Sequence, residues 1–115
     1  MPWSPHAMSS RASRRCQPVP LEVRETADLL ERRWQLSIIY AALTGALRFN
    51  EFAEAVAGIS PRMLSERLRD LEGAGLVQRT VIPSSPPTVE YRLTARGRKL
   101  GPLIEAMREY SREPL

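Results

Sequence analysis

The side chains best suited to chemistry in this 115-residue sequence are arginines and serines between positions 60 and 79. At about 100° per residue, Arg62, Glu66 and Arg69 share one face of a helix over residues 61–73, with Ser65 at its edge. A guanidinium group donates two parallel hydrogen bonds to O6 and N7 of guanine, and it also pairs with phosphate. The pattern therefore indicates non-covalent recognition of DNA. Arg62 is the expected base-reading residue, because only the N-terminal part of such a helix reaches base edges.

The remaining candidate contacts surround this face. Arg67, toward its flank, is expected to contact phosphate, and Glu66 is expected either to accept from a cytosine amine or to pair with a neighbouring arginine. A following hairpin adds arginines at its base and hydroxyls at its tip, which we expect to position the protein on the phosphate backbone. The candidate DNA-binding residues are Ser60, Pro61, Arg62, Ser65, Glu66, Arg67, Arg69, Arg79, Ser84, Ser85, Thr88 and Arg92. The alternative is an ordinary surface helix with Arg–Glu pairs at i, i+4 spacing.

Few residues in the sequence are suited to catalysis or to metal binding. Cys16 is the only cysteine and His6 the only histidine, and both lie in a proline- and serine-rich segment. One copy of each builds neither a disulfide framework, nor a zinc site, nor a serine–histidine–acid triad. We therefore expect a protein that is not an enzyme, with no metal site and no cofactor.

Helical spacing and caps predict the elements that position the arginines. Apolar residues recur helically over 22–32 and, more strongly, over 34–44, which Gly45 ends. Asn50 is a suitable N-cap for a helix through Val56, closed by Gly58. Ser60 then caps the helix over 61–73, with Pro61 at its first position. A tight turn between two short helices is typical of a helix-turn-helix.

The second half of the chain completes this outline. Residues 47–49 form a short extended piece, and residues 76–82 and 88–93 flank a proline-rich turn and predict a hairpin. Thr94 caps a last helix with apolar residues at Leu100, Leu103, Ile104, Met107 and Tyr110. The expected fold is mainly α with a small β-hairpin, a winged helix-turn-helix with helices at both ends available for dimerisation. Residues 1–20 are expected to be a flexible basic arm and 21–115 the DNA-binding domain.

The distribution of charge agrees with this interpretation. The net charge is +4, and residues 62–99 hold eight basic and four acidic side chains, whereas residues 22–58 hold four basic and six acidic ones. Clustered cations supply the salt-dependent part of nucleic-acid affinity. No run of eighteen apolar residues is present, and the basic N-terminus lacks the apolar stretch of a secretory signal. We expect no membrane contact and a cytoplasmic location.

Four stretches together resemble the HxlR-type family of winged-helix transcriptional regulators, which are similar in architecture to MarR-like proteins. They are residues 29–34, 45–51, 59–79, and 86–94 with Gly97 after them. The resemblance implies a bacterial homodimer that binds an inverted-repeat operator in double-stranded DNA, and we expect a repressor. It also implies that the segments before Trp34 and after Thr94 build the dimer interface.

Some proteins of this family sense oxidants or quinones through a cysteine near the start of the first helix. That position falls near Pro20 or Leu21 here, several residues after Cys16, which favours an ordinary tail thiol. Redox sensing through Cys16 is the alternative hypothesis, because Arg14 and Arg15 beside it favour a reactive thiolate. Two further hypotheses are a small-molecule effector bound near Trp34, Tyr40 and Met107, and a module that binds protein or RNA. The sequence identifies no particular effector.

Overall fold

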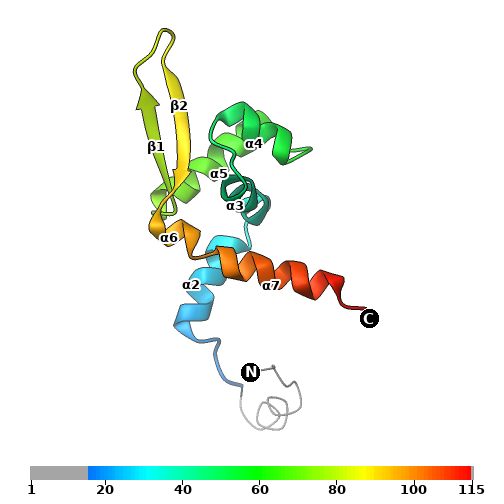
Figure 1. The fold of residues 1–115 in the computed structure, drawn as a ribbon. Helices are drawn as coiled ribbons and strands as arrows, with labels where there is room; N and C mark the ends of the chain where they lie inside the picture. Colours follow the sequence, from blue (N-terminus) through cyan, green and yellow to red (C-terminus); the bar gives the residue numbers. More distant parts are fainter. Residues whose placement is uncertain (1–15, 115) are drawn as a thin grey trace.

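The computed structural model describes residues 16–114, which form a mostly helical protein with one antiparallel hairpin (Figure 1). The expected fold class is thus confirmed. The expected arm over residues 1–20 lies for the most part outside the described residues, and within residues 16–114 the first helix begins at Leu21. The elements are α2 (Leu21–Leu30), α3 (Gln35–Leu43), α4 (Phe49–Ala55), α5 (Pro61–Gly73), β1 (Val77–Ile82), β2 (Thr88–Leu93), α6 (Ala95–Arg98) and α7 (Gly101–Arg112).

The core forms around α3, which is apolar over most of its circumference. Ile38 and Ile39 of α3 are fully buried, as are Phe52 of α4 and Leu64 and Leu71 of α5. Burying side chains of this size removes large apolar surfaces from water, which is the main force that holds these three helices together. Helix α3 also contacts β2 and α7, so it links the helix-turn-helix to the rest of the fold.

One polar side chain lies inside this core without a partner. Gln35, the first residue of α3, is fully buried, and neither its amide nitrogen nor its amide oxygen has a hydrogen-bond partner within residues 16–114. A buried amide that lacks such bonds carries a desolvation cost that nothing offsets. Gln35 therefore weakens the core that it helps to fill.

Replacing Gln35 by methionine should raise the free energy of unfolding by about 1–2 kcal/mol, because methionine keeps the shape and removes the unpaired amide. Urea unfolding followed by circular dichroism measures the change. Gln35→Glu is the opposing variant, since it places a charge in the same space and should destabilise the fold. A Gln35→Met protein less stable than the wild type would show that the amide is satisfied in solution.

The start of α4 differs from the sequence prediction. The helix begins at Phe49 with Arg48 as its N-cap, so Asn50 already lies in the first turn. The carboxylate of Glu51 accepts hydrogen bonds from the backbone N–H groups of Leu47, at 2.8 Å, and Arg48, at 2.9 Å. The Glu51 carboxylate thus satisfies two backbone donors just before the first turn, which explains why the cap lies before Asn50. Residues 47–49 form no strand, although Leu47 O accepts one hydrogen bond from Tyr91 N of β2.

The hydrogen bonds from the Arg48 and Leu47 N–H groups hold the pKa of Glu51 below its ordinary value of 4.5. An acid with a lowered pKa in the folded state adds stability above its unfolded pKa, and that stability disappears as pH falls through the folded value. Glu51→Gln should therefore lower the melting temperature at pH 7 by roughly a few degrees, and the difference should vanish well below pH 4. Melting curves over pH 3–7 test this, with Glu54→Gln in the same helix as the control. A difference that persists at low pH would contradict the role of the charge.

The expected last helix is divided in two. Thr94 caps α6, accepting a hydrogen bond from Gly97 N at 3.1 Å, and α7 begins only at Gly101. The Thr94 hydroxyl also donates to Gly75 O at 2.6 Å, which ties α6 to the residues just before β1. Gly97 is buried in this contact, and a Cβ atom there would collide with the backbone oxygen of Leu76. The division lets α6 lie flat against the base of the hairpin.

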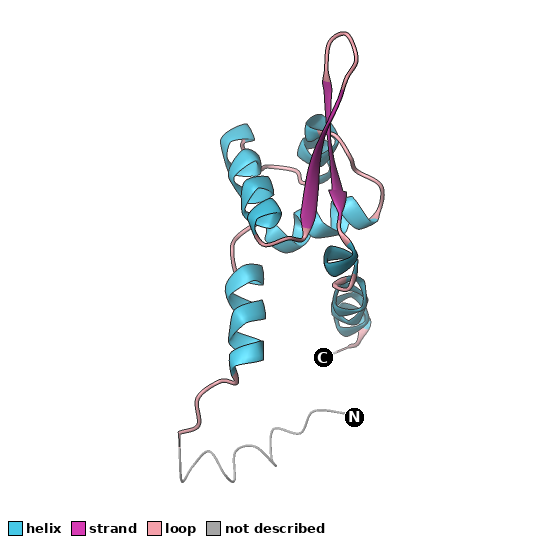
Figure 2. Cartoon of the chain, turned by 90° about the vertical axis from the view of Figure 1, so that its left-hand side faces the viewer, coloured by secondary structure: helices cyan, strands magenta, loops and turns pink. Residues whose placement is uncertain are grey.

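The hairpin tip and the terminal helices lie on opposite sides of the molecule. In both views the hairpin projects from one end and α2 runs away from it at the other end, and α7 leaves the body on the side away from the hairpin tip (Figures 1 and 2). Helix α2 has no buried residue, and Leu21 and Val23 of α2 are exposed, as are Leu103, Met107 and Tyr110 of α7. The terminal helices therefore present apolar side chains to solvent, away from the hairpin.

Candidate nucleic-acid interface

The expected orientation of α5 appears in the structure. Ser60 caps the helix by accepting a hydrogen bond from Met63 N at 3.1 Å, and Pro61 follows as the first helical residue. Leu64, Leu68 and Leu71 are buried against the core. The opposite face is exposed and carries Arg62, Ser65, Glu66 and Arg69. The leucines thus anchor a helix whose polar face is open to a partner.

The arginines on this exposed face are free to make outside contacts. Arg62 and Arg69 form no ion pair within the described part of the chain, and Glu66 forms none there either. The i, i+4 pair of Arg62 with Glu66, which an ordinary surface helix would use, is therefore not formed. A guanidinium group without an internal partner keeps all its donors for a base or a phosphate.

A groove between α5 and the hairpin extends the polar face of α5. It has a volume of about 530 Å³ and is lined by Ser65, Arg69, Glu72, Arg79 and Tyr91. Arg79 of β1 lies opposite Tyr91 of β2, and directly paired residues share a face of the hairpin. The groove therefore brings Arg79 beside Arg69 and Ser65, as an interface along DNA requires.

Arg92 does not join this group. It pairs in register with Gln78, so it lies on the face of the hairpin opposite Arg79. Its guanidinium group donates to Glu90 Oε1 at 2.9 Å. At the hairpin tip, Ser84 and Ser85 are both exposed, and the Ser84 hydroxyl donates to Pro86 O at 2.6 Å and lies 3.0 Å from Thr88 Oγ1. Ser84 and Thr88 therefore stabilise the turn itself, whereas the Ser85 side chain faces solvent.

Arg67 has internal partners instead of the exposed position expected of a phosphate contact. Its side chain is 18% exposed, its Nε donates to Arg33 O at 3.0 Å, and its NH1 donates to Asp70 Oδ2 at 2.7 Å. Arg32 contributes a second ion pair to the same carboxylate oxygen, at 2.9 Å. Sequence reasoning missed this cluster, although the i, i+3 spacing of Arg67 and Asp70 was a signal for part of it.

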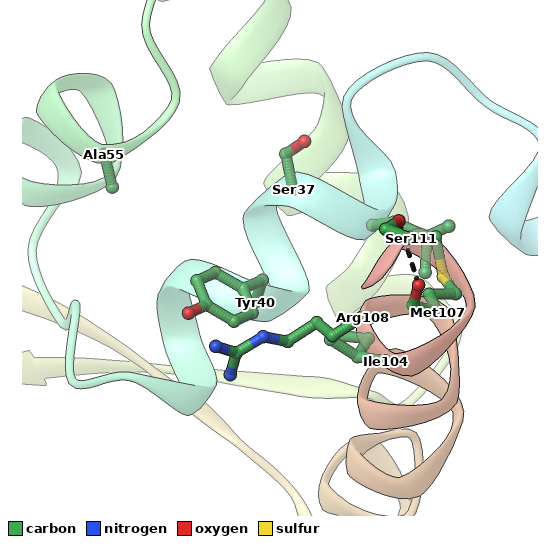
Figure 3. A pocket seen from close by; sticks show the side chains of 8 residues that line it. Ser37, Tyr40, Ala55, Ile104, Met107, Arg108 and Ser111 are labelled. Atoms are coloured by element: carbon green, nitrogen blue, oxygen red, sulfur yellow. Dashed lines mark hydrogen bonds between the residues drawn. The ribbon is translucent and has the colours of Figure 1, made fainter. Parts of the chain in front are cut away.

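A second cavity, of about 350 Å³, lies between α3, α4 and α7 (Figure 3). Tyr40 and Met107 line it, as expected for an effector site, and the guanidinium carbon of Arg108 lies 6.0 Å from the Tyr40 ring centroid. Trp34 does not line it. An apolar wall with one cation and the hydroxyl groups of Ser37 and Ser111 suits a small amphiphilic molecule.

The remaining predicted sites have simple outcomes. Cys16 is a free and exposed thiol, while Arg14, Arg15 and His6 lie outside the described residues. Within residues 16–114, no three His, Cys, Asp or Glu side chains gather in a way that could hold a metal ion. None of the described helices is both long enough and apolar enough to cross a membrane.

Comparisons with known proteins agree with this geometry. The model of the HxlR-like helix-turn-helix family matches residues 29–115. The HTH-type transcriptional regulator YvaP of Bacillus subtilis is 39% identical over 89 residues, which cover 77% of this chain and 82% of YvaP. Among solved structures, reduced YodB of B. subtilis superposes with a TM-score of 0.73 at 34% identity, covering 82% of this chain and 92% of YodB. The redox regulator HypR in its oxidised form gives 0.74 at 38% identity, covering 82% and 99%.

The family model matches most of the chain, and the relatives match over most of their own length. Their winged helix-turn-helix architecture is also the one that the caps, the buried leucines and the hairpin produce here. The chain therefore belongs to the HxlR-like helix-turn-helix family of transcriptional regulators.

Proposed function

We propose that this protein represses transcription by binding an inverted-repeat operator in double-stranded DNA as a homodimer. The observation that carries the proposal is the exposed face of α5, where Arg62 and Arg69 have no internal ion pair within the described chain and continue toward Arg79. Arg62 near the helix start reads a base, Ser65 and Glu66 make adjacent contacts, and Arg69 and Arg79 hold phosphates. Bacterial DNA lies in the cytoplasm, so the protein acts there.

The capping residues contribute through the backbone. Ser60 and Pro61 begin α5, and the positive end of the helix dipole at this start favours a phosphate there. Ser85 at the hairpin tip is a further phosphate contact. Arg92 contacts DNA only if it exchanges Glu90 for a phosphate, and Arg67, Ser84 and Thr88 position the elements that carry the direct contacts.

The apolar surface of the terminal helices supports the homodimer. Leu21 and Val23 on α2, with Leu103 and Met107 on α7, are about half exposed, and Tyr110 is 77% exposed. Two copies that cover these side chains would form a closed two-fold contact. A two-fold dimer presents two α5 helices to one side of a duplex, about 34 Å apart, which is one turn of DNA.

Selection from a random duplex pool tests the main proposal. We expect the selected sequence to be an inverted repeat. The logarithm of its association constant should fall linearly with the logarithm of the salt concentration, and sedimentation equilibrium should show a dimer. A promoter that carries the repeat should be more active in a strain lacking the protein. If the protein binds no duplex even at low salt, the winged helix serves a protein or RNA partner instead.

A redox-controlled regulator is the second candidate. It is favoured by the likeness to HypR, described as a redox regulator, and by the free exposed thiol of Cys16 five residues before α2. A disulfide between the two Cys16 residues of a dimer would link the segments that lead into its interface. Mild oxidation should then change operator affinity in the wild type and leave Cys16→Ser unaffected. An equal response of both proteins would remove this candidate.

A further inference from the structure

A four-residue junction, 31–34, connects α2 to the helix-turn-helix. Trp34 has a left-handed backbone with φ of 79°, which turns the chain sharply into α3. Its ring packs beside the turn between α4 and α5, because a Cβ added to Gly58 would lie 3.7 Å from Trp34 Cη2. The guanidinium carbon of Arg33 lies 4.6 Å from the centroid of the same ring, within cation–π range. The junction therefore contacts the turn that orients α5.

The carboxylate of Asp70 ties α5 directly to this junction. Its Oδ2 atom accepts from Arg67 NH1 at 2.7 Å and pairs with Arg32 NH1 at 2.9 Å, so one oxygen holds two guanidinium groups from different segments. Arg67 continues the chain of contacts, because its Nε donates to Arg33 O at 3.0 Å. We call Arg32, Arg67 and Asp70 the α5 clamp. Charge-assisted hydrogen bonds of this kind are short and directional, so the clamp fixes an angle well.

Helix α2 depends on this attachment for its direction. It buries no residue of its own, and only Leu29 and Leu30 near its end pack partly against the core. Its exposed large apolar side chains, Leu21 and Val23, are the ones offered to a second subunit. The angle between α2 and α5 is consequently set at the junction, where the clamp lies.

We propose that Asp70 is a positioning residue that sets the angle between α2 and α5 and thereby the preferred spacing of the two operator half-sites. The inference rests on the proposed homodimer on an inverted repeat. In such a dimer, the subunit contact places the two α2 helices, and the clamp places each α5 relative to its α2. One added base pair moves a half-site by about 3.4 Å and rotates it by about 35°. With the clamp intact, the dimer should therefore bind one spacer length much more tightly than the others, and without the clamp the affinities for different spacers should be more similar.

A spacer series tests the proposal. The selected inverted repeat is prepared with its spacer shortened and lengthened in steps of one base pair, beside a duplex with a single half-site, and affinities are measured by fluorescence anisotropy. For Asp70→Asn we expect the preference for the best spacer to fall by roughly two- to thirtyfold, with single half-site affinity close to the wild type. Arg32→Gln should also lower the preference for the best spacer. Asp70→Glu, which keeps a carboxylate acceptor, should retain most of the wild-type preference.

Glu54→Gln is the matched control. It removes one negative charge from the exposed surface of α4, outside the lining of the groove, and Glu54 forms no ion pair within residues 16–114. Any gain in affinity from the lost charge should then be equal at all spacings. An unchanged spacer profile in Asp70→Asn would overturn the clamp and leave the regulator proposal standing. An equal loss on every duplex, the single half-site included, would also overturn it, because Asp70 would then act on α5 alone. A wild type that binds no duplex would end both proposals.

Discussion

Replacing Arg62 by alanine should weaken operator binding by about 1–3 kcal/mol, which is roughly a five- to 150-fold increase in Kd. The residue lies on the exposed face near the start of α5 and has no ion pair within the described chain. A side chain that reads guanine through O6 and N7 contributes to one base position, so the guanine preference there should disappear with it. Anisotropy on the selected operator and on duplexes substituted at each position measures both effects.

Two further variants separate the recognition of a base from the electrostatic attraction to phosphates. Arg112→Ala removes the same charge from the end of α7, far along the chain from α5, and should leave the affinity nearly unchanged. Arg69→Ala should weaken binding to all sequences alike and reduce the salt slope by about one, as expected for a phosphate contact. If Arg62→Ala lost affinity equally for every sequence, Arg62 would be a phosphate contact and some other residue would read the base.

Gly97→Ala should be strongly destabilising, by about 3 kcal/mol, with a fall in melting temperature of roughly 10–20 °C. An added Cβ would collide with the backbone oxygen of Leu76 and lie 2.9 Å from Leu93 Cδ2. A backbone oxygen cannot rotate away as a flexible side chain does, so α6 would have to move off the hairpin base. Thermal unfolding followed by circular dichroism measures the loss.

Gly73→Ala is the control for this substitution. Gly73 ends α5, and an added Cβ would have no atom within 4 Å. This variant should keep the wild-type stability or gain up to about 1 kcal/mol, because alanine restricts the unfolded chain more than glycine does. A Gly97→Ala protein as stable as Gly73→Ala would show that α6 can shift at little cost.

Local sequence patterns were sufficient for most of the helix-turn-helix. The leucines of α5 recur at helical spacing and Ser60 and Pro61 mark its start, so its buried and exposed faces could be predicted without tertiary information. The hairpin was equally clear, since two β-rich runs enclose a proline-rich turn. The sequence did not show which hairpin arginine faces the α5 groove. The pairing of the two strands shows that Arg79 faces it and that Arg92 does not.

The features that were missed depend on contacts between segments distant in sequence. Arg67 was expected at a phosphate, but Arg33, 34 residues earlier, offers its carbonyl oxygen, and Asp70 is shared with Arg32. The apolar spacing begins only at Leu100, and Gly101 with Pro102 was a signal for a new helix start that sequence reasoning missed. The contact of Gly97 with Leu76 had no local signal, because it joins segments that are distant in sequence. Asn50 has the better intrinsic preference for a cap, yet the reach of Glu51 back to two N–H groups placed the start of α4 earlier.

The absence of buried side chains on α2 has a consequence for measurements at low protein concentration. An isolated helix of ten residues is only marginally stable in water, so α2 depends on contacts with other parts of the fold or with a second subunit. In the proposed homodimer, dilution below the subunit dissociation constant should therefore melt α2 as the subunits separate. Titrations at nanomolar protein would then include the free energy of refolding this segment, and affinities obtained at different subunit concentrations would not describe the same reaction.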